Sequence, residues 1–147
     1  MEIYQHSIIS IILTVVLWPL YGPWALLAIV GGVLIDSDHV LWYWAKSNKF
    51  NIKKTYSYCQ NVGQTANIKE YKQAWMPFHS YEALLALMIL SIIFPQSTPL
   101  LIGLLLHLLL DFFWVLYNWK DMLFFHLFCK SGIVFFYLWF KGSFRKH

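Results

Sequence analysis

The sequence predicts an all-α membrane protein, a single domain over residues 1–147 that forms a bundle of four to five transmembrane helices. Hydrophobic residues make up 59% of the chain and charged residues only 12%, whereas about a quarter of the residues in a soluble domain are charged. The apolar residues fall in long runs, and a helix needs about 17–25 mostly apolar residues to cross a bilayer. Acids and histidines at helical spacing lie in or beside three of these runs, which predicts one polar cluster in the cytoplasmic half of the bundle.

The expected spans are separated by turn-forming residues. Trp18–Pro23 contains two prolines and a glycine, so the first two spans should form a hairpin. In the second run, Gly31-Gly32 permits either close approach of a neighbouring helix or a local break just before the acids. Pro95–Pro99 is a short turn in which Thr98 is a candidate helix cap. The expected spans are therefore residues 4–21, 23–45, 79–94 and 99–119, with a fifth at 122–140 that either crosses or folds back.

The polar segment at residues 46–78 is expected to be a loop with one short surface helix at Asn67–Trp75. It carries six lysines, and lysines beside membrane helices favour the cytoplasmic side and contact anionic lipids. The net charge of +4 therefore indicates membrane lipids as partners and no nucleic acid. The first residues lack the basic segment of a signal peptide, so the first run is expected to be a permanent helix. Cys59 and Cys129 are too few for a disulfide framework or a thiolate metal site.

Three acid–histidine elements lie on separate segments. They are Asp36-Ser37-Asp38-His39, His79-Ser80-Tyr81-Glu82 and His107-Leu108-Leu109-Leu110-Asp111. Spacings of three or four residues put both side chains on one face of a helix. Ionisable groups in apolar helices are costly unless they are paired, metal-bound or facing a wet cavity. If the four spans form two hairpins, all three elements and His6 come to the same side as the lysines, which the positive-inside rule makes cytoplasmic.

Imidazole nitrogens and carboxylate oxygens are ligands of zinc, manganese and iron, and mixed shells with several carboxylates can hold two ions. We therefore expect one or two divalent ions, with zinc preferred and manganese or iron as alternatives. The predicted metal ligands are His6, Asp36, Asp38, His39, His79, His107 and Asp111. Some of these side chains would orient the ligands rather than bind the ion. Glu82 is the predicted general base or acid, and Asp38 is the second predicted catalytic residue.

Each element also has a simpler structural interpretation. The Asp36 element could cap a helix at the membrane interface, and the His79 element could be a capping box. His107 and Asp111 could be a buried pair bonded only to each other. His126 has no acid at helical spacing and is expected to be an ordinary packed histidine. The agreement of the three elements in depth and side favours the metal site.

At these residues the chain resembles the YdjM-like family of small inner-membrane proteins, which are described as membrane-bound metal-dependent hydrolases. The elements that match, in the same order over residues 1–119, are His6, Asp36-Ser37-Asp38-His39, His79-Ser80 and His107-Leu108-Leu109-Leu110-Asp111. Ile35 stands where the family usually has proline, and Trp75–Phe78 replaces an Arg-x-x-Thr-like lead-in, which removes a candidate phosphate clamp. The resemblance implies the cytoplasmic (inner) membrane of a prokaryote and a lipid or phosphodiester substrate.

The leading hypothesis is a metal-dependent hydrolase in which metal-activated water attacks a lipid or phosphoester-like, amphiphilic substrate at the cytoplasmic membrane face. Two alternatives remain open. The same residues could carry protons or divalent cations, although a transporter needs access from both sides and the outer half is apolar. The metal could also only lock a non-catalytic membrane module. Loss of thermal stability without loss of any activity would identify that last case.

Overall fold

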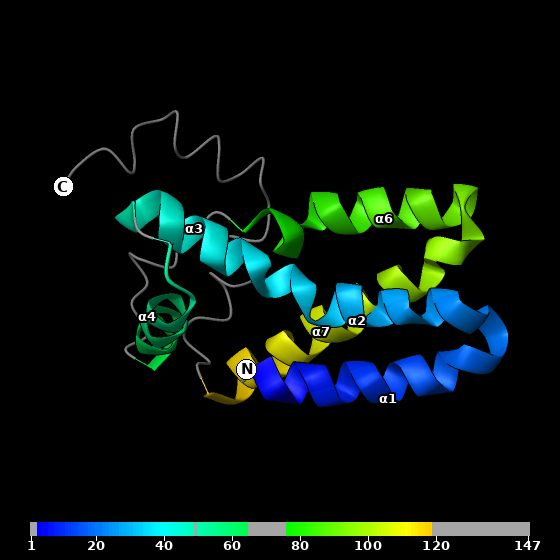
Figure 1. Ribbon diagram of the computed structural model, residues 1–147, viewed down its shortest axis with the longest axis horizontal. Coiled ribbons are helices and arrows are strands. Elements are labelled where there is room, and N and C mark those ends of the chain that lie inside the picture. Colours follow the sequence, from blue (N-terminus) through cyan, green and yellow to red (C-terminus); the bar gives the residue numbers. More distant parts are fainter. Residues whose placement is uncertain (1–2, 49, 65–75, 119–147) are drawn as a thin grey trace.

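The computed structural model describes residues 3–48, 50–64 and 76–118, which form helices and the turns between them (Figure 1). The predicted all-α class is confirmed for this part of the chain. Two stretches, Tyr4–Ser47 and Pro95–Tyr117, are long and apolar enough to cross a membrane, and Tyr81–Ile93 is a shorter apolar helix. The fifth span expected at 122–140, the surface helix expected at Asn67–Trp75, and His126 lie outside the described residues.

The first stretch is a helical hairpin rather than one long rod. Helix α1 (Ile3–Tyr21) is followed by the 3₁₀ turn η1 (Gly22–Leu26) and then by α2 (Leu27–Gly32), which packs antiparallel to α1 (Figure 1). Gly22 has a φ of 53°, a left-handed conformation that glycine adopts at little cost, and a proline follows it in η1. The reversal expected at this position is therefore present.

The span expected at residues 23–45 is interrupted just before the acids. Helix α2 ends at Gly32, a 3₁₀ turn η2 follows (Leu34–Asp36), and a new helix α3 (Ser37–Ser47) continues the chain. Val33, between them, has a φ of −128° and a ψ of −52°, so the regular hydrogen-bond ladder cannot continue through it. The break places the two aspartates at the start of a new helix instead of within a continuous one.

A second helical hairpin completes the described bundle. Helix α6 (Tyr81–Ile93) begins at Ser80, whose Oγ accepts a hydrogen bond from the Ala83 N–H at 3.1 Å, the usual geometry of an N-cap. A 3₁₀ turn η3 (Pro77–His79) precedes the cap, and η4 (Pro95–Ser97) connects α6 to α7 (Thr98–Asn118). The end of α7 and the start of α6 lie toward the same end of the bundle as the start of α1 and the α2–α3 junction (Figure 1).

Glycines let α2 and α7 pack backbone against backbone. A Cβ on Gly31 would collide with the Leu100 carbonyl oxygen, and a Cβ on Gly103 would collide with the Ala28 carbonyl oxygen. Small residues at such crossings are typical of helix pairs in membranes. Both possibilities raised by the glycine pair at 31–32 are thus realised, the close approach here and the break immediately after it.

The segment at residues 46–78 differs from the expected loop. It contains the 13-residue helix α4 (Ile52–Gln64), and α3 extends to Ser47. Asn51 explains the start of α4, because its side-chain oxygen accepts a hydrogen bond from the Lys54 N–H at 2.9 Å. Thr55 is buried, and Tyr58 and Cys59 follow it at helical spacing on the same face. This short periodic pattern was hidden by the polar composition of the segment.

Burial in the structure is reversed relative to a soluble protein. The buried polar or charged side chains include His6, Ser10, Thr14, Asp38 and His107. Large apolar side chains cover the outside of α1, α6 and α7. Soluble proteins rarely expose such extensive apolar surface, whereas a bilayer would cover it. The pattern adds a three-dimensional argument to the length and composition of the apolar stretches.

Candidate metal centre

All seven predicted ligands come together at one end of the bundle, from four separate parts of the chain. Their ligand atoms form three overlapping groups, each with all atoms within 4.8 Å of one another: His6, His107 and Asp111; Asp36, His79 and His107; and Asp38, His39 and His79. The first and second groups share His107, and the second and third share His79. The cluster is therefore continuous. The role of each side chain depends on which of its nitrogen or oxygen atoms points toward its neighbours.

The two 3₁₀ turns explain how distant segments meet. Turn η2 packs against η3, so Asp36, at the end of η2, lies beside His79, at the end of η3. The Oδ1 atom of Asp36 is 3.5 Å from Nε2 of His79. Helix α7 supplies His107 and Asp111 one helical turn apart, with 3.4 Å between His107 Nε2 and Asp111 Oδ2. If the helix continued through Val33, the turn η2 would not form, and Asp36 would not be placed against η3 in this way.

Asp38 is a fully buried carboxylate that holds two imidazoles. Its Oδ2 lies 2.8 Å from Nδ1 of His79, and its Oδ1 lies 2.9 Å from Nδ1 of His39. An ionised carboxylate only accepts hydrogen bonds, so both Nδ1 atoms carry the proton. In a neutral imidazole the other nitrogen then has the lone pair, so Nε2 of His79 is available as a ligand. Asp38 therefore fits the role of a carboxylate that orients a metal-binding histidine.

The backbone fixes the second histidine in the same way. Nδ1 of His107 lies 2.9 Å from the carbonyl oxygen of Gly32 and must donate to it, because a carbonyl only accepts. The lone pair of neutral His107 is then on Nε2. The Nε2 atoms of His79 and His107 are 2.9 Å apart. Two lone pairs at that distance repel each other unless a positive species, a proton or a metal ion, lies between or beside them.

Two carboxylate oxygens lie near the facing pair of Nε2 atoms. Asp36 Oδ1 is 3.5 Å from Nε2 of both His79 and His107, and Asp111 Oδ2 lies 3.8 Å and 3.4 Å from the same two nitrogens. These separations exceed those of good N–H···O hydrogen bonds, about 2.7–3.2 Å. Ligands held about 2.0–2.2 Å from a tetrahedral ion are about 3.3–3.6 Å apart. Three of the four histidine–aspartate separations fall in that range, whereas the two Nε2 atoms, at 2.9 Å, would have to move apart to bind one ion.

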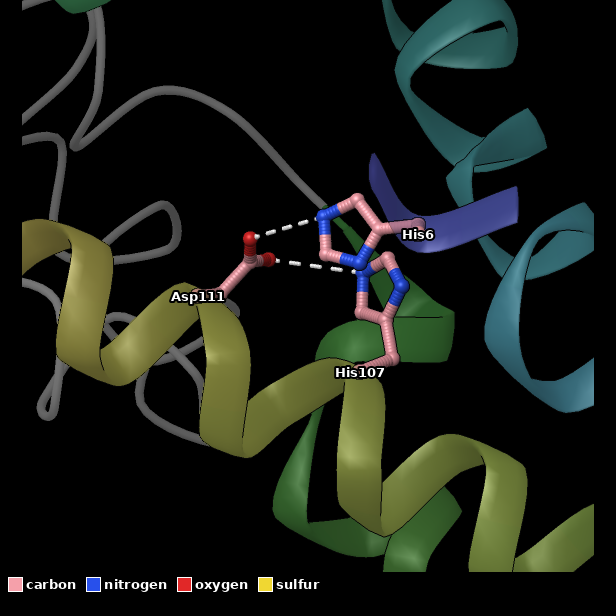
Figure 2. A group of neighbouring side chains, drawn as sticks. All are labelled: His6, His107 and Asp111. Atoms are coloured by element: carbon pink, nitrogen blue, oxygen red, sulfur yellow. Dashed lines mark ion pairs between the residues drawn. The ribbon is translucent and has the colours of Figure 1, made fainter. Parts of the chain in front are cut away.

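His6 contacts both Asp111 and His107. Nε2 of His6 lies 3.3 Å from Asp111 Oδ1, and its ring stacks on the ring of His107 with centroids 4.1 Å apart (Figure 2). Its Nδ1 is buried and has no hydrogen-bond partner among the described residues. An orphaned buried nitrogen is costly. A second ion or a water molecule bound at this nitrogen would remove that cost.

The side chains of the cluster differ in exposure. The side chains of His107 and Asp38 have no exposure, whereas those of Asp36 and Asp111 are 21% and 17% exposed. Asp36 and Asp111 are thus the more exposed of the four proposed ligand side chains. A donor set of two imidazoles and two carboxylates suits zinc, manganese or iron. The residues therefore fit a divalent ion, without distinguishing among these metals.

Two other predicted or neighbouring groups lie outside this set. Glu82 is half-buried in the first turn of α6, three residues after His79, and belongs to none of the three groups. Cys59 lies on α4 near the acidic part of the cluster. Burial, reinforced by the charges of Asp36 and Asp38, raises the pKa of its thiol to about 12. Cys59 belongs to none of the three groups.

Comparisons of the chain with protein-family models, curated proteins and solved structures find no match. The interpretation of the site therefore depends on its own geometry. Sequence reasoning missed one functional group, the carbonyl oxygen of Gly32, because a backbone acceptor has no residue signature. The adjacent glycines that permit the close α2–α7 packing were the available signal.

Proposed function

We propose that this protein is a membrane-embedded, metal-dependent hydrolase that acts on a lipid or another amphiphilic substrate. One observation carries the proposal: Oδ1 of Asp36 and Oδ2 of Asp111 each lie 3.4–3.8 Å from the facing Nε2 atoms of His79 and His107. In this proposal the ion is held by His79, His107, Asp36 and Asp111. Asp38 and Gly32 orient the two histidines, His39 is the second hydrogen-bond donor to Asp38, and His6 supports Asp111.

The proposed membrane placement has four crossing segments, α1, α2 with α3, α6, and α7. Helix α1 has 19 residues, about 28 Å at 1.5 Å per residue, which is close to the hydrocarbon thickness of a bilayer. The exposed apolar surface of α1, α6 and α7 would face lipid. The lysines of residues 46–54 begin in the last turn of α3 and continue after it, so the positive-inside rule favours the cytoplasmic side for the cluster. A family relationship to YdjM-like proteins would agree with this placement.

A divalent ion at this site would supply Lewis acidity, which lowers the pKa of water and polarises a carbonyl or phosphoryl oxygen. The protein residues would divide the remaining work. Asp36 and Asp111 are the partly exposed ligands, so a substrate would approach the ion past these two side chains. Glu82, outside the ligand set, would accept and return the proton. The exposed apolar surface favours a lipid-like substrate, because such a molecule would reach the site from the bilayer.

The test combines metal content with turnover. Purified protein in detergent would be given mixed micelles of phospholipids and neutral ester lipids, and released head groups and fatty acids would be measured by mass spectrometry. His107→Ala should lose both metal and turnover, and Glu82→Gln should keep the metal and lose turnover. Ser91→Ala is the matched control, because its hydroxyl donates to the Leu87 carbonyl oxygen and accepts from the Ser97 hydroxyl, neither of which belongs to the cluster, and it should lose neither metal nor turnover.

Two results would contradict the proposal. One is turnover that His107→Ala leaves unchanged, because the site would then not be catalytic. The other is a protein that binds metal but hydrolyses none of the lipids offered, while Asp36→Ala lowers only its thermal stability. That second result would indicate a structural ion in a non-catalytic module.

A transport function has one observation in its favour. His6, Ser10 and Thr14 repeat every four residues on the buried face of α1, so a polar stripe leads from the cluster into the apolar part of the bundle. The stripe ends there, since the next residue on that face is the buried Leu17. Proton or divalent-cation flux in proteoliposomes, abolished by His6→Ala, would support transport over hydrolysis.

A further inference from the structure

Helix α4 has two distinct faces. Thr55 is buried and Cys59 is half-buried on the side that packs against α3. Next to that side, at about 100° per residue, Ile52, Lys53 and Tyr56 fall within about a third of a turn, and all three are exposed. The exposed face thus combines a lysine with an aliphatic and an aromatic side chain. This combination is typical of helices that lie in a membrane interface.

The orientation of α4 matches that interpretation. In Figure 1 the helices α1 and α6 run across the view, whereas α4 is seen almost down its axis at the end of the bundle that carries the α2–α3 junction. Helix α4 therefore lies crosswise to the helices that would cross the bilayer. A helix perpendicular to membrane spans, located at one end of them, is parallel to the membrane surface.

Cation–π and aromatic contacts connect α3 and α4. The Lys46 ammonium donates a hydrogen bond to the Tyr58 hydroxyl at 2.7 Å and lies 5.3 Å from the ring centroid of Trp42. Asn48, with a φ of 54°, reverses the chain after α3. The side chains of Trp44 and Phe50, on either side of this reversal, are exposed and contact each other with ring centroids 6.4 Å apart. Two further aromatic anchors therefore flank α4.

The charge of this region has one sign. No acidic residue occurs in the sequence between Asp38 and Glu70, and the exposed side chains of α4 include Lys53 and Lys54. An acidic protein partner would explain the lysines but not the exposed aromatic side chains beside α3. The α3–α4 surface also continues directly from a stretch apolar enough to cross a membrane, which favours a lipid surface as the partner. Anionic lipid head groups complement the lysines, and the acyl boundary below them complements the aromatic and aliphatic side chains.

We propose that α4 is an interfacial helix that binds the anionic head groups of the bilayer through Lys53 and Lys54, with Trp44, Phe50, Ile52 and Tyr56 inserted at the acyl boundary. This inference rests on the membrane embedding in the proposed function and not on hydrolysis.

The experiment uses the full chain in nanodiscs of phosphatidylcholine, with or without phosphatidylglycerol. Each lysine near an anionic surface changes binding about fivefold. The double variant K53Q/K54Q should therefore lower the ratio of docked to undocked α4 about 25-fold, and K141Q/K146Q is the charge-matched control. A spin label at Tyr56→Cys, with both native cysteines replaced by serine, reports depth through its relative accessibility to oxygen and to a polar nickel complex.

The expected result is a label at head-group depth in anionic discs, displaced toward water by K53Q/K54Q or by high salt and unaffected by the control. In the native chain, acetylation of Lys53 and Lys54 should be slower in anionic than in zwitterionic discs, which provides a readout without any substitution. A label equally accessible to the nickel complex in both discs, with unchanged acetylation rates, would overturn the proposal. Failure of the chain to enter nanodiscs would instead contradict the membrane embedding itself.

Discussion

Replacing Asp38 by asparagine tests how the cluster is organised. The carboxylate has no exposure and accepts one N–H on each oxygen, from His79 at 2.8 Å and from His39 at 2.9 Å. An asparagine side chain has one accepting oxygen and one donating NH₂ group. One imidazole would therefore face a donor instead of an acceptor and would have to turn or change its tautomer.

The size of the effect follows from the role of Asp38. Removing a carboxylate that orients a metal-binding histidine typically weakens metal binding about 10- to 100-fold, which corresponds to about 1.4–2.7 kcal/mol. Asp36→Asn, which removes a proposed ligand, should weaken binding more than Asp38→Asn does. The assay is competition for zinc against a chromophoric chelator in detergent, with thermal unfolding of each variant measured alongside.

Two results would refute this reasoning. Unchanged affinity in Asp38→Asn would show that the orientation of His79 does not matter for binding. A loss as large as that in Asp36→Asn, in a protein that unfolds normally, would show that Asp38 binds the ion directly. The second result would restore the broader ligand set that the sequence predicted.

Three further predictions follow from the packing. Gly31→Ala should destabilise the protein by about 1–3 kcal/mol, because the new methyl group would collide with the Leu100 carbonyl oxygen, and a thermal melt in detergent would detect this; an unchanged melt would contradict the close helix contact. Ser80→Ala should cost about 1 kcal/mol through loss of the α6 cap, measured against Ser91→Ala, and equal melts for the two variants would argue against the cap. Cys59, with a pKa of about 12, should react with iodoacetamide at pH 7.5 about a thousandfold or more slowly than an ordinary thiol, followed by peptide mass spectrometry, and a rapid reaction would refute the burial of its thiol.

The sequence predicted the helical segments and left their irregularities open. The apolar runs and the turn at Trp18–Pro23 predicted the hairpin of α1 and α2, and the spacing of His107 and Asp111 put both on one face of α7. The break at Val33 depends on tertiary packing, and no local residue demanded it over a continuous helix. Helix α4 was missed because its pattern is short and its composition polar.

The candidate site shows the same division. Residue types and spacing identified the seven side chains that the structure brings together. Residue types and spacing could not separate metal ligands from supporting residues. That distinction depends on which nitrogen of each imidazole donates a hydrogen bond and which keeps its lone pair for the ion. The Gly32 carbonyl oxygen fixes His107, and the two oxygens of Asp38 fix His79 and His39. Such hydrogen bonds depend on angstrom-scale geometry between segments that are distant in the sequence.

The most direct test of the central claim is metal content by inductively coupled plasma mass spectrometry on the purified protein. The native protein and the Ser91→Ala control should each carry one or two equivalents of zinc, manganese or iron, and His107→Ala and Asp36→Ala should carry none. Absence of metal from the native protein, even after incubation with each ion, would contradict the claim. Full retention of metal in both variants would contradict it equally, because the proposed ligands would then not hold the ion.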